Sequence, residues 1–190
     1  MQLHKADVVD AAAALLDAYG IADLTMRRLA RELAVTPGAL YWHFPSKQAL
    51  LGAVADRILR PVADAPGEWH DRIVTTSAQL RDALLSHTDG ADLVSASFAA
   101  GQSAAMTRVV SLLSDAVAEA GVPREQAGLT ARTVVYYVLG FTADEQSRLQ
   151  WDAAGAVLPD RQSVLTTDPS ARFEFGLRLL VDGIAHALVS

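Results

Sequence analysis

The sequence predicts an all-α fold, because apolar residues recur at helical spacing along most of its 190 residues. No segment shows the strict alternation of apolar and polar residues that is typical of a half-buried β-strand. Apolar residues make up 51% and charged residues 20% of the chain, which excludes general disorder. No apolar run approaches the roughly 18 residues of a membrane helix, and acidic residues interrupt the N-terminal apolar stretch as they do not in a signal peptide. We therefore expect a cytoplasmic protein with no membrane partner.

Three helices are predicted near the N-terminus. The first ends at Gly20, which suits a left-handed C-terminal cap. The second begins at Thr25 and the third at Thr36, whose side-chain oxygens can cap free backbone donors. Pro37 then occupies the first helical position, where no backbone donor is lost. The tight connection between the second and third helices is typical of a helix-turn-helix, whose second helix enters the DNA major groove.

A fourth helix, predicted over 46–63, leads to a second domain. The Asp-Ala-Pro-Gly break at 64–67 is the expected boundary. We predict a helix-turn-helix DNA-binding domain over 1–63 and a ligand-binding and dimerisation domain over 68–190. In the second domain, periodicity predicts helices around 69–84, 106–117, 124–150 and 173–188, and composition predicts a loop over 152–169.

Charge is distributed unevenly along the chain. The formal net charge is −6, but residues 25–60 hold six basic and two acidic side chains, whereas residues 61–190 hold nine basic and sixteen acidic ones. A basic block on an acidic body favours a local footprint for a polyanion. The alternative is that these arginines only solvate helix surfaces.

The predicted third helix suits contact with DNA. Its leading residues at 37–39 are small, so the backbone can approach base edges closely. Leu40 and Phe44 are four residues apart and are expected in the core, which turns Tyr41 and His43 outward. Basic residues flank this helix on both sides and suit phosphate groups.

The residues at 24–30 and 38–51 resemble the DNA-binding domain of the tetracycline-repressor (TetR) family, and those at 83–91, 139–146 and 173–177 resemble its tetracycline-binding subfamily. The resemblance implies a homodimeric, ligand-responsive repressor of a near-palindromic operator. It implies that Trp42 is partly buried at the helix edge. The expected DNA-binding residues are Thr25, Arg27, Arg28, Thr36, Pro37, Gly38, Ala39, Tyr41, Trp42, His43 and Lys47.

The residues expected to bind magnesium-tetracycline are replaced here. Val94 stands where the resemblance implies a metal-ligating histidine, and Asp144 stands where it implies a glutamate. Because magnesium needs oxygen or nitrogen ligands, we expect no metal, no cofactor and an unknown, more apolar effector. The candidate ligand-binding residues, each of which could instead be ordinary core, are Leu80, Leu84, His87, Val94, Ser97, Phe98, Val109, Leu113, Val135, Tyr136 and Asp144.

Glycines inside the predicted C-terminal helices indicate close packing. Each such glycine costs about 1 kcal/mol relative to alanine, which close approach between helices would offset. The resemblance implies a four-helix bundle formed by the long helix and the last helix of two chains. The expected dimer-interface residues are Gly140, Gly176, Leu180, Gly183 and Ile184. The competing interpretation is that these helix positions simply tolerate glycine and that no close helix packing requires it.

An enzyme is one alternative class of function. The five histidines are scattered, there is no cysteine, and the chain lacks a His-Glu-x-x-His zinc motif, a glycine-rich phosphate loop and a serine-elbow motif. We therefore predict no catalytic residues and no enzyme. The remaining alternative is a helix-turn-helix protein whose body is a non-responsive dimerisation or partner-binding module.

Overall fold

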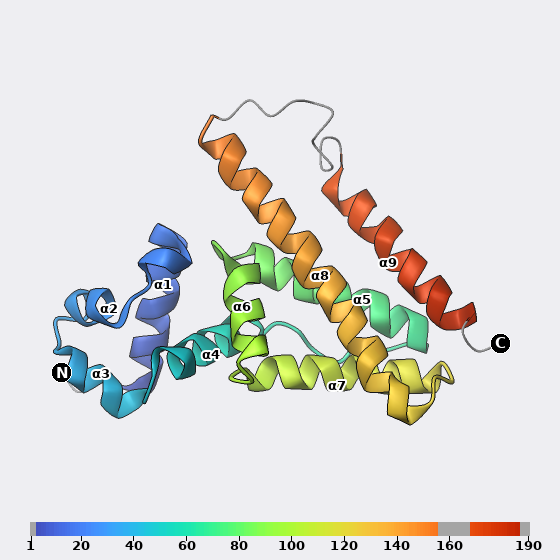
Figure 1. Cartoon of the computed structure of the whole chain (residues 1–190), viewed down its shortest axis with the longest axis horizontal. Helices are drawn as coiled ribbons and strands as arrows, with labels where there is room; N and C mark the ends of the chain where they lie inside the picture. Colours follow the sequence, from blue (N-terminus) through green and yellow to red (C-terminus); the bar gives the residue numbers. More distant parts are fainter. Residues whose placement is uncertain (1–2, 156–167, 187–190) are drawn as a thin grey trace. The chain divides into compact units, whose positions relative to one another are not determined.

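The computed structural model describes residues 3–155 and 168–186, and all regular secondary structure in these ranges is helical (Figure 1). The predicted all-α fold is confirmed. Most of the predicted loop at 152–169, and the predicted end of the last helix at 188, lie outside the described residues. The helices are α1 (Lys5–Asp23), α2 (Met26–Glu32), α3 (Pro37–His43), α4 (Lys47–Ile58), α5 (Trp69–Leu85), α6 (Gly90–Ala99), α7 (Ala104–Glu119), α8 (Arg124–Ala153) and α9 (Pro169–His186).

The chain forms two compact units, one of residues 1–61 with 82–107 and the other of residues 62–81 with 108–190. The first unit therefore contains α6 as well as the predicted DNA-binding domain. Gly52 of α4 shows how closely this segment packs, because a Cβ there would collide with the backbone of Gln102. The Asp56 carboxylate of α4 also accepts hydrogen bonds from the Ser103 hydroxyl at 2.7 Å and from the Ala105 N–H at 2.8 Å.

One unpredicted helix and two helix boundaries differ from the sequence prediction. The sequence prediction missed α6. Its ten residues are too few to show a clear helical repeat of apolar residues, and Asp89 before it is left-handed (φ 52°) and makes no side-chain cap. α4 ends at Ile58 rather than near 63, since Pro61 disfavours a helical residue before it and supplies no backbone donor. Gly20 has the predicted positive φ (76°), but it interrupts α1 instead of ending it.

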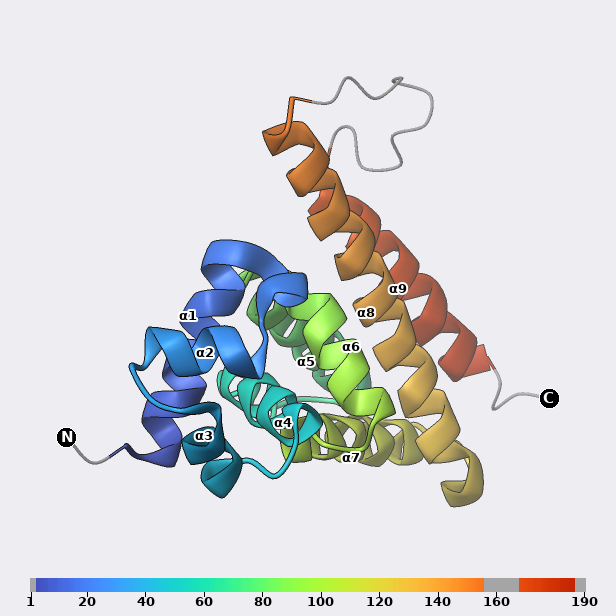
Figure 2. The same cartoon turned by 60° about the vertical axis from the view of Figure 1, so that its left-hand side comes forward.

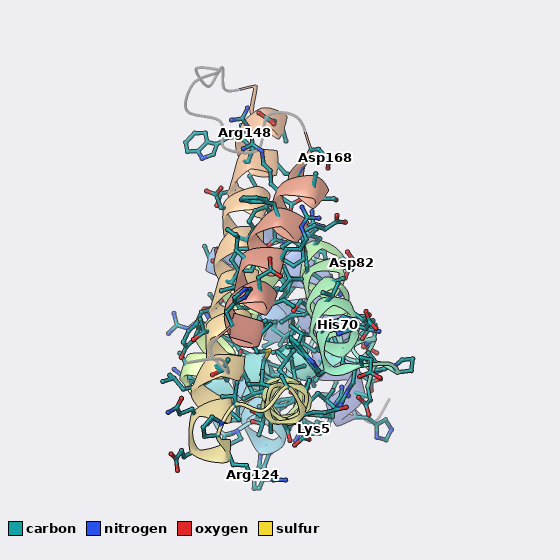
Figure 3. All side chains as sticks on the ribbon, turned by 90° about the vertical axis from the view of Figure 1, so that its right-hand side faces the viewer. Lys5, His70, Asp82, Arg124, Arg148 and Asp168 are labelled. Carbon is teal, nitrogen blue, oxygen red and sulfur yellow. The ribbon has the colours of Figure 1, made fainter. Side chains whose placement is uncertain are left out.

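In the second unit, α8 and α9 run antiparallel. Figure 3 shows Asp168, at the start of α9, at the Arg148 end of α8 and far from Arg124. The Tyr137 hydroxyl of α8 donates to the Phe173 carbonyl of α9 at 2.8 Å, and the two rings stack with centroids 5.6 Å apart. Burial raises the pKa of the Tyr137 phenol, against the opposing effect of the nearby arginine charge, so the group remains a donor at neutral pH.

A buried ion pair joins α5 and α8 in the same unit. Arg81 donates from Nε and Nη2 to the two Glu145 carboxylate oxygens at 2.9 and 2.7 Å. The Arg81 guanidinium also lies 5.1 Å from the centroid of the Phe173 ring of α9. Neither charged residue was singled out by the sequence, because their pairing depends on helix packing. Within the described ranges, no helix is both long and apolar enough to cross a membrane.

Candidate DNA-binding site

The turn between α2 and α3 is built by two helix caps and one left-handed residue. The Thr25 hydroxyl accepts from the Arg28 N–H at 3.1 Å, and the Thr36 hydroxyl accepts from the Ala39 N–H at 3.3 Å. Ala34 between the helices has φ 52°, and the next N–H donates back to Ala30 at 2.9 Å. The two short helices form the predicted helix-turn-helix.

The buried side of α3 fixes how the helix is rotated. Leu40 and Phe44 are 0% and 1% exposed and anchor α3 in the core of the first unit, as predicted. The Lys5 ammonium of α1 lies 4.9 Å from the centroid of the Phe44 ring. This anchoring leaves the opposite side of α3 facing solvent.

The exposed side of α3 carries two aromatic residues. Tyr41 is 49% exposed, as its predicted outward orientation requires. Trp42 is 92% exposed, so the expectation that it is partly buried is wrong. Trp42 is two residues from both Leu40 and Phe44, about 200° around the helix from each, and therefore opposite the buried side. His43 is half-buried, whereas Thr36, Pro37 and Gly38 are exposed at the leading end.

Arg27 and Arg28, at the start of α2, differ in whether their side chains already have partners within the protein. Arg27 is exposed and has no acidic partner among the residues that the structure describes. Arg28 donates from Nη1 to the Asp23 carboxylate at 2.6 Å, and its guanidinium lies 3.7 Å from the centroid of the Tyr19 ring. The sequence did not distinguish the two arginines, since Asp23 and Tyr19 approach Arg28 only after α1 and α2 pack.

Lys47 is the first residue of α4, the helix that follows α3. The Ser46 hydroxyl caps this helix by accepting from the Ala49 N–H at 3.1 Å. Lys47 itself is half-buried and is the first residue of α4, where the backbone N–H groups of the first turn have no partner within the helix. This arrangement suits a phosphate oxygen.

The candidate effector residues are distributed over both units. The apolar members are buried except Phe98, which is half-buried; His87 is half-buried, and Tyr136 and Asp144 are exposed. The Ser97 hydroxyl, and the Ser77 hydroxyl that the sequence did not single out, are buried without a hydrogen-bond partner in the described structure. The first unit holds Leu84, His87, Val94, Ser97 and Phe98, and the second holds Leu80, Val109, Leu113, Val135, Tyr136 and Asp144.

Among the described residues, no cluster of three or more acidic or histidine side chains has a metal-binding arrangement.

Some candidate dimer residues are free to meet a second chain, and others pack within one chain. A Cβ at Gly140 or Gly183 would meet no atom within 4 Å. A Cβ at Gly176 would collide with the Tyr137 ring, so this glycine permits a close approach within one chain. Ile184 is buried and Leu180 is half-buried. A groove of about 360 Å³ runs between α8 and α9, lined in part by Leu129, Leu179 and Gly183.

A capped helix-turn-helix with an exposed aromatic face, beside an arginine that has no acidic partner in the described ranges, defines a DNA-binding protein of the helix-turn-helix class. Residues 8–54 match the family described as bacterial regulatory proteins, tetR family, and residues 61–157 match the tetracycline repressor-like C-terminal domain. The chain belongs to the TetR family of transcriptional regulators.

Solved and curated relatives span nearly the whole chain. The crystal structure of Mycobacterium smegmatis BioQ is 60% identical over 97% of this chain and 99% of that chain, with a TM-score of 0.90. A structure of BioQ with its natural double-stranded DNA operator is 57% identical over the same shares, with a TM-score of 0.85. The Escherichia coli class A tetracycline repressor from transposon 1721 is 32% identical over 97% of this chain and 91% of its own length.

Proposed function

We propose that the protein is a repressor that binds a near-palindromic double-stranded operator as a homodimer and is released by a small molecule other than magnesium-tetracycline. The exposed face of α3, with Tyr41 49% and Trp42 92% exposed, is the observation that carries the DNA-binding part. The solved complex of BioQ with its operator supports the same assignment. A helix of this kind fits the major groove, which is about 12 Å wide.

An exposed apolar stripe along α8 and α9 supports the homodimer. On α8, Leu129 and Tyr136 are 69% and 56% exposed and share a face with Gly140. On α9, Phe175 and Leu179 are each 58% exposed, and Gly183 follows one further turn along. A second copy of the chain would cover this stripe in a two-fold arrangement. The two recognition helices of such a dimer would reach half-sites about 34–36 Å apart.

The effector part of the proposal rests on the candidate pocket residues. Val94 gives magnesium no ligand, and its side chain is 0% exposed. The unpaired Ser97 hydroxyl is the polar position best suited to contact an effector, because a buried hydroxyl without a partner costs about 1–3 kcal/mol. An effector that prefers the conformer with misplaced recognition helices would weaken operator binding, and the operator would weaken effector binding by the same factor.

Tyr41→Ala and Lys47→Ala should each weaken operator binding about tenfold, since each removes one polar contact to DNA. The operator is first selected from random duplexes with the wild-type protein, and the variants are then titrated by fluorescence anisotropy. Circular dichroism and light scattering check that each variant stays folded and dimeric. Wild-type affinity in both folded variants would show that the DNA-binding residues are assigned wrongly.

Arg27→Ala should weaken operator binding about tenfold or more, whereas Arg28→Ala should weaken it less. The Arg27 guanidinium has no acidic partner in the described structure, but Arg28 is already held by Asp23 and Tyr19. Parallel titrations of the two variants, which carry the same charge change, provide matched controls. A larger effect of Arg28→Ala would contradict this division of roles.

The complete burial of several candidate effector residues favours the alternative, in which the second domain does not respond to a ligand. Leu80, Val94 and Val135 are all 0% exposed, as ordinary core residues are. A thermal-shift screen against hydrophobic small molecules and antibiotics, followed by an operator-release assay on each hit, separates the alternatives. Release of the operator by any hit supports the responsive repressor, and stabilisation by none supports the non-responsive body.

A further inference from the structure

The C-terminal end of α1 is joined to the turn between α5 and α6 by a set of polar contacts, which we name the α1 latch: Asp17, His87, Thr88 and Asp89. The Asp17 carboxylate lies 3.0 Å from the His87 Nδ1 and accepts from the Thr88 N–H at 3.1 Å. Both segments belong to the first unit. Figure 2 shows the end of α1 beside the start of α6.

The break in α1 supplies the backbone groups of the latch. In an uninterrupted helix, the Ile21 N–H would donate to the Asp17 carbonyl four residues earlier. Gly20 interrupts that hydrogen bond with φ 76°, and both freed groups find partners in the turn. The Ile21 N–H donates to the Asp89 carboxylate at 2.8 Å, and the Thr88 hydroxyl donates to the Asp17 carbonyl at 3.0 Å.

Glycine is required at the break for two reasons. Its positive φ is a conformation that other residues rarely adopt. A Cβ at Gly20 would also lie 2.7 Å from the Asp89 carboxylate oxygen, closer than such atoms pack. The break therefore fits the incoming turn as well as the local backbone.

The same end of α1 also holds the helix-turn-helix. Arg28 of α2 donates to Asp23 at 2.6 Å and lies over the Tyr19 ring at 3.7 Å. Residues 17–23 thus contact α2 through Arg28 and the α5–α6 turn through the latch. The turn carries His87, which is also a candidate effector residue.

We propose that the α1 latch positions the helix-turn-helix for operator binding. This inference rests on the proposed function, and it makes Asp17 and Thr88 positioning residues that contact no DNA. A latched unit loses less conformational freedom when it binds the operator, so it binds more tightly than a loosened one.

Asp17→Asn and Thr88→Val should each weaken operator binding about three- to tenfold, because the first replaces a charged acceptor with a neutral amide and the second removes one hydrogen bond. For Asp17→Asn, weaker operator binding distinguishes the latch from a simple charge effect, because removing a negative charge alone would strengthen binding to DNA. The dependence of log affinity on log salt concentration should keep its slope, since no phosphate contact is lost. Thr88→Ser, which keeps the hydroxyl, should restore wild-type affinity.

Asp71→Asn serves as the matched control, because it makes the same charge change on α5 in the second unit, where Asp71 is exposed. Full-length dimers of all variants are titrated with the selected operator and melted in parallel. The latch proposal is overturned if folded Asp17→Asn and Thr88→Val bind as tightly as wild type, or if their melting temperatures fall while operator affinity stays unchanged. A wild-type protein that binds no duplex refutes the proposed function itself, and the latch proposal with it.

Discussion

An Arg81→Met variant is expected to lose about 3–5 kcal/mol of its free energy of unfolding, because it leaves the Glu145 carboxylate buried without a partner. The two side chains are only 10% and 9% exposed, and they share two hydrogen bonds. Methionine fills a similar volume but offers no charge and no donor. Urea denaturation at neutral pH, with all variants at one protomer concentration, measures the loss.

The surface ion pair between Arg72 and Glu119 provides the control for this prediction. It has an equally short 2.7 Å contact, but the Glu119 side chain is 51% exposed. Arg72→Met should therefore lose less than about 1 kcal/mol. The double variant Arg81→Met with Glu145→Leu should recover most of the loss, since it removes the unpaired charge as well. A loss below about 1 kcal/mol for Arg81→Met alone would contradict the buried pair.

Local features of the DNA-binding helices could be predicted from the sequence. The caps at Thr25, Thr36 and Ser46 depend on residues only three positions apart, so they are visible in the sequence. The buried pair Leu40 and Phe44 follows from helical spacing alone. Both predictions needed no knowledge of how distant segments pack.

Features that depend on distant segments could not be predicted in this way. The availability of Arg27 and the restraint of Arg28 follow from the packing of α1 against α2. Gly176 is explained by Tyr137, which lies on another helix. The grouping of residues 82–107 with the first unit depends on contacts with α1 and α4 that no periodicity encodes.

Trp42 is an instructive error, because the sequence held the information needed to avoid it. Once Leu40 and Phe44 are placed in the core, the residue midway between them must face away. The family resemblance implied partial burial, and the helical geometry implied exposure. The 92% exposed fraction agrees with the geometry.

Leu179→Glu is expected to abolish the dimer and to weaken operator binding more than about a hundredfold, because a charge would be buried unpaired at the proposed interface. Leu179 is 58% exposed on α9, beside the groove between α8 and α9. In a two-fold dimer the substitution acts twice, and a monomer reaches only one half-site. Analytical ultracentrifugation measures the association state, and anisotropy titration measures operator affinity.

Val74→Glu tests whether this effect is specific to the proposed interface. Val74 is 39% exposed on α5, where it lines a separate groove with α9 residues such as Phe173 and Leu177 and not the stripe of α8 and α9. The same new carboxylate should leave this variant dimeric and able to bind the operator. If Leu179→Glu also stays dimeric while remaining folded, the stripe is not the dimer interface. A monomeric Leu179→Glu that kept wild-type operator affinity would contradict the proposal that two recognition helices bind a near-palindromic operator together.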